Sequence, residues 1–216
     1  MLPTLNALLG AQARHVPLVV DFDGTLCCAD TLLWLRQRCV TGRGELEEGR
    51  VRARTVSKQA EKVYLWHQVG LPVEELPYET DLIDALKAER ATGRAVVLAT
   101  GSARGFAEAV ADHLGIFDRA MGTDESVNMT GVRKSAALQR AFGQRGFDYV
   151  GDSAADVPVW QSAGQGILLD RPGAPAFAVP DNVVRVRSAR ALEPFPTALR
   201  LNPLAAVDPV STGHYH

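Results

Sequence analysis

An apolar run over residues 16–22, interrupted only by Asp21 and followed at once by Asp23 and Gly24, constrains the fold more than any other feature of the sequence. A continuous apolar run, in place of alternating polar and apolar residues, is typical of a strand that is buried on both faces. Such strands belong to parallel sheets with helices on both sides. Because Asp21 and Asp23 are two residues apart at the strand end, we expect both to face the crevice where α/β sheets bind ligands.

Strand and helix patterns alternate along most of the remaining chain, which indicates an α/β fold with a three-layer, Rossmann-like, doubly wound parallel sheet. The later strands are expected over residues 94–99, 119–122, 147–150, 166–169 and 183–186. The helices between them are expected over residues 81–90, 102–114, 134–145 and 154–163. A short amphipathic helix over residues 4–14 is expected to precede the first strand.

The charged, helical segment from residue 30 to about 76 is too long for an ordinary crossover, so we expect a small helical cap inserted after the first strand. Gly42 and Gly44 are expected to divide it into two helices. Seven of the twelve prolines lie in the last 45 residues, which indicates an irregular end. The expected organisation is therefore a core over residues 1–26 and 79–190, a cap over 27–78 and a tail over 191–216.

Charge and cysteine content exclude several classes of protein. The 23 basic and 25 acidic residues give a net charge of -2, so general binding to nucleic acid or to a membrane surface is not expected. No apolar run reaches the roughly 18 to 20 residues that cross a bilayer, so no membrane insertion is expected. The three cysteines lack the paired spacing of a zinc site, which favours a reducing, cytoplasmic setting.

Residues 36–62 hold six arginines and two lysines against four glutamates, a local excess of positive charge. A solvated helical face is one explanation of this excess. A basic cap that attracts an anionic substrate is the other, and the sequence leaves both open.

Three further segments place polar side chains at strand ends or at the start of a helix. Thr100 and Gly101 follow an apolar strand and precede a helix, where a hydroxyl and backbone N–H groups bind phosphate oxygens well. Lys134, one of four lysines, is expected to begin the next helix. Asp152 ends another strand and Asp156 lies one helical turn further. Clustered carboxylates are the ligands of a hard cation such as Mg²⁺.

These segments, in this order, resemble the four motifs of the haloacid dehalogenase-like (HAD) superfamily, over residues 16 to about 169. The resemblance implies a Mg²⁺-dependent phosphomonoester hydrolase that acts through an aspartyl-phosphate. It also implies a role for each matching residue: Asp21 as nucleophile and Asp23 as general acid/base; Thr100 and Lys134 on the transferring phosphoryl group; Gly24, Thr25 and Gly101 in the phosphate-binding loops; Asp21, the Asp23 carbonyl and Asp152 as Mg²⁺ ligands; Asp156 behind Lys134 or the metal.

Structural explanations compete with several of these roles. An Asp-Gly pair is common in turns, Thr100 or Ser102 can act as an ordinary helix cap, and Asp156 can stabilise a helix N-terminus. Arg133 is the alternative to Lys134. Phosphotransferase or phosphomutase activity remains an alternative reaction. Dehalogenases of the superfamily lack the second aspartate of the first motif, so the presence of Asp23 favours phosphoryl transfer.

A closer resemblance, over residues 17–26, 76–78, 97–100 and 146–160, is to the HAD domain found N-terminal to some UbiA-type membrane prenyltransferases. It implies that the chain can associate with a membrane prenyltransferase, and a non-catalytic partner domain is therefore a further alternative. No apolar stretch long enough to span a bilayer follows Leu201. The expected ligand is a small phosphorylated metabolite enclosed by the cap.

Overall fold

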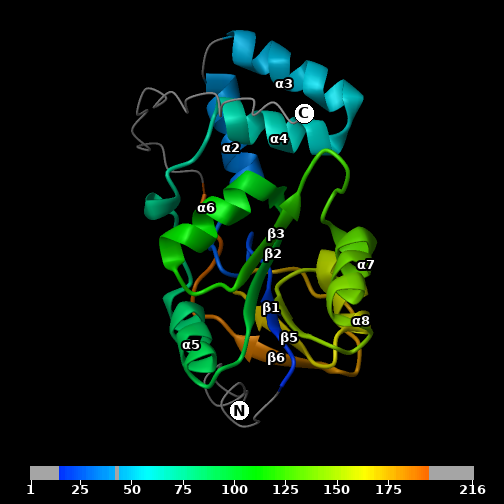
Figure 1. The fold of residues 1–216 in the computed structure, drawn as a ribbon. Coiled ribbons are helices and arrows are strands. Elements are labelled where there is room, and N and C mark those ends of the chain that lie inside the picture. The colour runs from blue at the N-terminus through cyan, green and yellow to red at the C-terminus, as the bar shows by residue number, and fades with distance from the viewer. Residues whose placement is uncertain (1–14, 42–43, 195–216) are drawn as a thin grey trace.

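The computed structural model of the protein describes residues 15–41 and 44–194, and a six-stranded sheet lies at its centre (Figure 1). All five strand pairs are parallel, in the order β3-β2-β1-β4-β5-β6. The strands are β1 (Leu18–Val20), β2 (Val96–Ala103), β3 (Arg119–Thr123), β4 (Asp148–Gly151), β5 (Gly166–Asp170) and β6 (Val183–Arg187). The predicted α/β fold with a doubly wound parallel sheet is confirmed.

Helices cover both faces of the sheet, α5 (Thr80–Ala91) and α6 (Arg104–Leu114) on one side, α7 (Gly131–Phe142) and α8 (Val157–Ser162) on the other (Figure 1). Leu18 and Val20 of β1 belong to the core cluster that contains residues of α5 and α6. Val19 belongs to the second cluster, with residues of α7 and α8. Residues 18–20 of β1 are all apolar because each face of the strand meets its own layer of helices.

A cap of helices lies between β1 and β2 in the sequence and above the carboxyl ends of the strands in Figure 1. It consists of α2 (Thr31–Thr41), α3 (Gly44–Val56), α4 (Lys58–Gln68) and the 3₁₀ turn η1 (Val73–Glu75). The expectation of two helices was wrong. The additional break falls at Ser57, whose Oγ accepts a hydrogen bond from the Ala60 N–H (3.0 Å) and so begins α4.

Other element boundaries differ by a few residues from those expected. β2 continues through Ala103, so α6 begins at Arg104, and α7 begins at Gly131, before Lys134. The expected helix over residues 154–163 is divided into η2 (Ala154–Asp156) and α8. The expected helix over residues 4–14, and the tail beyond residue 194, lie outside the described residues.

The described start of the predicted tail returns to the core. The Glu193 N–H donates to the Cys28 carbonyl (2.6 Å), and the Arg190 guanidinium donates to the Tyr78 carbonyl (2.5 Å). These contacts place residues 190–193 beside the junction of cap and core.

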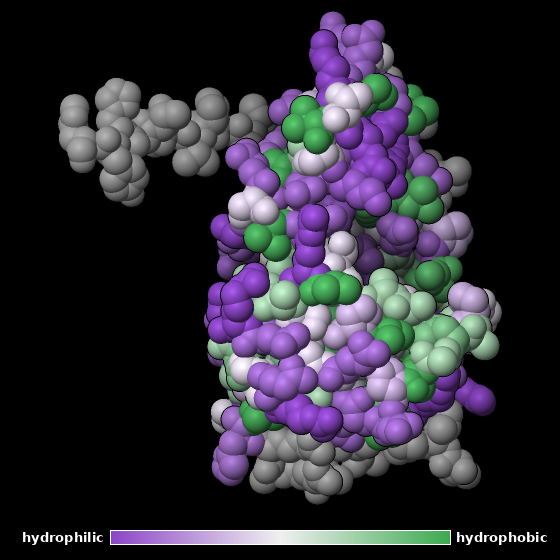
Figure 2. All heavy atoms as spheres, turned by 90° about the vertical axis from the view of Figure 1, so that its right-hand side faces the viewer, coloured by the Kyte–Doolittle hydropathy of each residue, from purple (hydrophilic) through white to green (hydrophobic). Residues whose placement is uncertain are grey.

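The surface of the cap mixes residue types. Figure 2 shows hydrophobic residues scattered among hydrophilic ones at the cap end, rather than gathered into one patch on that face. The exposed apolar side chains of the cap include Leu33, Val40, Val51 and Val56. Among the helices of residues 15–41 and 44–194, none combines the length and apolar character that crossing a membrane requires.

Candidate active site

A cavity of about 380 Å³ lies where the strands end beneath the cap. Its walls come from the segments after β1 and β4, from β2, from the start of α7, and from the cap. The lining residues are Asp21, Asp23, Gly24, Asp30, Leu32, Lys62, Gly101, Ser102, Thr130, Gly131, Lys134, Asp152, Ser153, Ala155, Asp156 and Leu192. The fold thus brings segments more than 100 residues apart to one cavity.

Asp21 and Lys134 form an ion pair in this cavity. Lys134 Nζ donates to Asp21 Oδ1 at 2.8 Å, and the two residues are only 3 % and 8 % exposed, respectively. Burial raises the pKa of Asp21 to about 8 although Lys134 opposes the shift. Burial also acts to lower the pKa of Lys134, but Asp21 and Asp156 outweigh it and the net shift is upward. The lysine therefore remains a cation beside the expected nucleophile.

Asp156 fixes the surroundings of that pair. Its Oδ1 accepts a hydrogen bond from the Tyr149 hydroxyl (2.7 Å), which in turn accepts one from Lys134 Nζ (2.9 Å). Its Oδ2 accepts the backbone N–H groups of Asp152 (3.2 Å) and Ser153 (3.3 Å). Sequence reasoning missed Tyr149, although it stands three residues before Asp152 in the motif.

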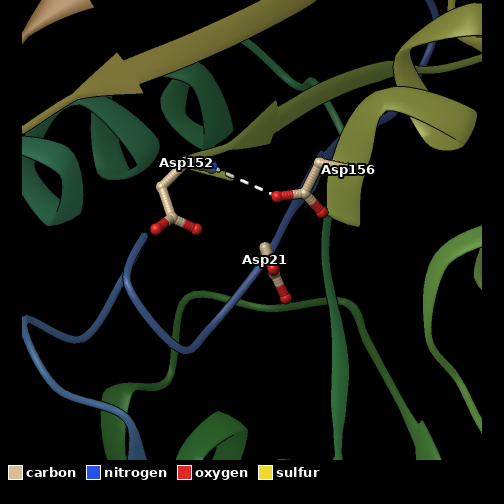
Figure 3. A group of neighbouring side chains, drawn as sticks. All are labelled: Asp21, Asp152 and Asp156. Atoms are coloured by element: carbon tan, nitrogen blue, oxygen red, sulfur yellow. Dashed lines mark hydrogen bonds between the residues drawn. The ribbon is translucent and has the colours of Figure 1, made fainter. Parts of the chain in front are cut away.

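Three carboxylates in the cavity fit a divalent cation. One oxygen each of Asp21, Asp152 and Asp156 lie within 4.8 Å of one another, and Figure 3 shows Asp21 after β1 with the other two after β4. Burial, and then the negative charge of Asp156, raise the pKa of Asp152 to about 7, as is expected where carboxylates lie close together. Oxygen ligands of this kind suit Mg²⁺. Because both oxygens of Asp156 already accept hydrogen bonds, Asp21 and Asp152 are the freer ligands.

The side chain of Asp23 is held apart from this cluster. Its Oδ1 accepts hydrogen bonds from the Thr31 N–H (2.7 Å) and hydroxyl (2.5 Å), and its Oδ2 accepts one from Ser102 Oγ (2.9 Å). Burial raises the pKa of Asp23, and Thr31 opposes the rise. Such a carboxyl group can hold and release a proton, and it leaves only the main chain of Asp23 for the expected metal contact.

The hydroxyl group that lines the cavity from β2 belongs to Ser102. Thr100 is fully buried and does not line the cavity, and its Oγ1 accepts the Ser102 N–H (3.0 Å). Gly101 lines the cavity as expected. The sequence pattern predicts at most a helix cap at Ser102, because it does not indicate that β2 continues to Ala103.

Gly24 and Thr25 shape the position of Asp152. Gly24 has φ of +76°, and a Cβ there would lie 2.2 Å from Asp152 Oδ2, so the turn requires glycine. Thr25 Oγ1 donates to Asp152 Oδ1 (3.1 Å). Arg171, which the motifs did not indicate, donates to the carbonyls of Gly24 and Thr25 and to Glu79 (2.8 Å). Arg171 thus fixes the loop after β1 on the side of its backbone carbonyls.

The positive charge of the cap is organised around one buried glutamate. Glu61 is 1 % exposed and accepts hydrogen bonds from Arg36 (2.8 Å) and Arg50 (2.8 Å), with Arg54 at 3.6 Å. Although burial alone would raise the pKa of Glu61, Arg36 and Arg50 hold it below its usual value. None of these three arginines lines the cavity, so their observed role is to form ion pairs with Glu61 within the cap.

The model of the haloacid dehalogenase-like hydrolase family matches residues 18–161. The chain belongs to this family. The uncharacterized protein y4nM of Sinorhizobium fredii is 33 % identical over 171 residues, which is 72 % of this chain and 30 % of that protein. The chain therefore spans less than a third of this curated relative.

Solved structures of other proteins share the fold. A protein of unknown function from Bordetella pertussis Tohama I has a TM-score of 0.55 at 19 % identity, covering 73 % of this chain and 91 % of that one. A substrate-bound phosphoserine phosphatase has a TM-score of 0.50 at 16 % identity, covering 74 % and 89 %. Similarity at this level concerns the fold and leaves the reaction to the residues of the site.

Proposed function

We propose that this protein is a Mg²⁺-dependent phosphomonoester hydrolase in which Asp21 is the nucleophile. The observation that carries the proposal is the contrast between two carboxyl groups that are two residues apart. Asp21 accepts a hydrogen bond from the Lys134 ammonium in the carboxylate cluster, whereas Asp23 accepts hydrogen bonds only from the uncharged donors of Thr31 and Ser102. Paired groups in different environments are the usual arrangement for a nucleophile and a general acid.

Lys134 supports attack by one anion on another. A carboxylate that approaches a phosphate meets electrostatic repulsion, and a buried ammonium 2.8 Å from Asp21 Oδ1 reduces it. Tyr149 holds that ammonium in place, because its hydroxyl accepts a hydrogen bond from Lys134 Nζ and donates one to Asp156 Oδ1. Transfer to Asp21 then divides hydrolysis into formation and breakdown of an aspartyl-phosphate.

Asp23 would protonate the departing alcohol oxygen and later deprotonate the attacking water. Its two oxygens accept from Thr31 and Ser102, so its orientation is set before substrate binds. A dehalogenase has no use for this second carboxyl group, which is why the pair favours a phosphatase. Asp21, Asp152 and the Asp23 carbonyl are the proposed Mg²⁺ ligands. The bound ion would supply charge neutralisation for the phosphate.

Substitution of Asp21 by asparagine tests the proposal. The amide is nearly isosteric, so we expect an unchanged fold and a loss of at least about 10³-fold in kcat. Release of phosphate from p-nitrophenyl phosphate and a panel of small phosphomonoesters, with Mg²⁺ and with chelator, provides the measurement. Asp84→Asn, on an exposed position of α5, is the matched control. Equal turnover by Asp21→Asn and Asp84→Asn would remove Asp21 from the mechanism.

Two alternatives are separated by the same preparation. Added acceptor alcohols that become phosphorylated would favour a phosphotransferase over a hydrolase. Absence of turnover across the panel, together with specific capture of a membrane prenyltransferase, would favour the non-catalytic partner domain. The chain matches only 30 % of its curated relative, so association with further domains stays a proposal.

A further inference from the structure

Lys62 enters the cavity from the cap, and none of the four motifs accounts for it. It lies on α4, is 8 % exposed and lines the cavity. Its Nζ donates to the Gly101 carbonyl (2.6 Å) and to Asn128 Oδ1 (2.9 Å), both in the core. Lys62 therefore bridges the cap to the edge of the site at the end of β2.

The partners of Lys62 do not neutralise its charge. Both acceptors are uncharged. Among the described residues, no carboxylate oxygen lies within 4.0 Å of Lys62 Nζ, the distance that defines an ion pair. A buried ammonium is costly to desolvate when it has no anion beside it. Burial accordingly lowers the pKa of Lys62 to about 8, with the charge of Asp23 acting in the opposite direction. Packing alone would be served better by an apolar side chain.

An ammonium group has three donors, and two of those on Lys62 are in use. The third has no acceptor among the residues that the structure describes. The nearby carboxylates are engaged elsewhere: Asp21 accepts from Lys134, and Asp23 from Thr31 and Ser102. The remaining N–H and the remaining charge are thus available to a ligand in the cavity.

The position of Lys62 indicates which part of a ligand it meets. Lys134 contacts the proposed nucleophile Asp21, so it lies on the side of the phosphoryl group. Lys62 enters from the cap, and among charged groups Asp23 has the largest effect on its pKa. Asp23 is the proposed proton donor to the leaving group, so the cap side near Asp23 is the leaving-group side. This step rests on the proposed phosphatase function.

We propose that Lys62 binds a carboxylate on the leaving group, so that the substrates are small phosphorylated hydroxy acids. One free N–H with one positive charge matches a monoanion, and a cavity of about 380 Å³ suits a small molecule. Lys62 is then a specificity-determining residue.

Three probes that differ in one substituent test the proposal. 2-Phosphoglycolate carries a carboxylate, ethyl phosphate a methyl group in its place, and phosphoethanolamine an aminomethyl group, which bears a positive charge. Calorimetric binding in Mg²⁺ buffer to the Asp21→Asn protein measures affinity without turnover. We expect 2-phosphoglycolate to bind about 10-fold or more tighter than ethyl phosphate, as for a hydrogen bond to a charged group, and phosphoethanolamine to bind weakest.

Substitution of Lys62 in the same background assigns the preference. Lys62→Met is expected to abolish the difference between 2-phosphoglycolate and ethyl phosphate, and Lys62→Arg to retain part of it. Lys58→Met, on an exposed position of the same helix, is expected to change neither affinity. Circular dichroism and thermal melting check that each variant is folded.

Several results would overturn the proposal. One is equal affinity for 2-phosphoglycolate and ethyl phosphate in the protein with Lys62 intact. Another is a preference for 2-phosphoglycolate that persists in Lys62→Met. A third is an equal loss of affinity for all three probes in Lys62→Met, which would assign Lys62 to the phosphoryl group or to cap closure. Because binding is measured without turnover, these results are independent of whether the protein hydrolyses phosphomonoesters. Failure of the proposed function is detected separately, as absence of phosphate release by the protein with Asp21 intact.

Discussion

In the absence of divalent cations, the free energy of unfolding of this protein is expected to fall as the pH rises from about 4 to 8. Asp21 and Asp152 have pKa values of about 8 and about 7 in the folded protein, against 3.8 for an ordinary aspartate. Below about pH 4 both carboxyl groups are protonated in folded and unfolded chains alike. Between the pKa of each group in the unfolded chain and its higher pKa in the folded protein, the folded protein binds more protons than the unfolded chain. Its free energy of unfolding therefore falls as the pH rises. Above pH 8 these groups cause no further loss.

The magnitude follows from the proton difference. Each proton retained by the folded protein alone costs about 1.4 kcal/mol of stability per pH unit, and a chain of this size loses about 2–4 °C in Tm per kcal/mol. Mg²⁺ competes with these protons for the same oxygens. Its stabilising effect should therefore grow across the same pH range, towards about 2.7 kcal/mol at 100 times its Kd.

Thermal melting at half-unit steps from pH 4.5 to 8.5, with chelator and with Mg²⁺, measures both effects. The Asp21→Asn, Asp152→Asn double variant is the control, since it removes two of the carboxyl groups with raised pKa values and should reduce the slope of the chelator curve, leaving the contribution of Asp23. Equal slopes for the double variant and the unaltered protein in chelator would refute the reasoning. A Mg²⁺ effect that is independent of pH would show that the ion binds elsewhere.

Two further substitutions test the geometry around the cavity. Ser102→Ala removes the hydrogen bond to Asp23 Oδ2 (2.9 Å) and should lower kcat about 10-fold, whereas Thr100→Ala, at a fully buried position, should lower Tm and leave kcat closer to normal. The reverse pattern in steady-state kinetics and melting would restore Thr100 as the phosphate ligand. Gly24→Ala should weaken apparent Mg²⁺ affinity at least about 10-fold, because its Cβ would displace the Asp152 carboxylate and φ is +76°. An unchanged Mg²⁺ titration of activity would contradict this.

Much of the core could be predicted from the sequence because each signal is local. The run around β1 must be a strand buried on two faces, and the aspartates after β1 and β4 must meet, since parallel strands end at the same edge. Lys134 required the order of the motifs as well. The ion pair with Asp21 joins residues 113 positions apart, and no periodicity indicates such a contact.

The cap was harder to predict for physical reasons. Gly42 and Gly44 are conspicuous breaks, whereas the break at Ser57 depends on one side-chain bond to the Ala60 N–H. Lys62 sits in a segment where basic residues are common, and only its burial and its two core acceptors distinguish it. The neighbouring Glu61 shows the same difficulty, because three arginines converge on a residue that the sequence presents as one of many charges.

Leu192 shows why the end of the described chain belongs to the site. The proline-rich composition predicted an irregular tail, and residues 190–193 are irregular in the structure. They nevertheless bond to Cys28 and Tyr78, at the two ends of the cap, and Leu192 lines the cavity between cap and core. The segment therefore contacts both connections between cap and core. Because the same short stretch also supplies Leu192 to the cavity wall, it belongs to the candidate site, which its proline-rich composition alone did not indicate.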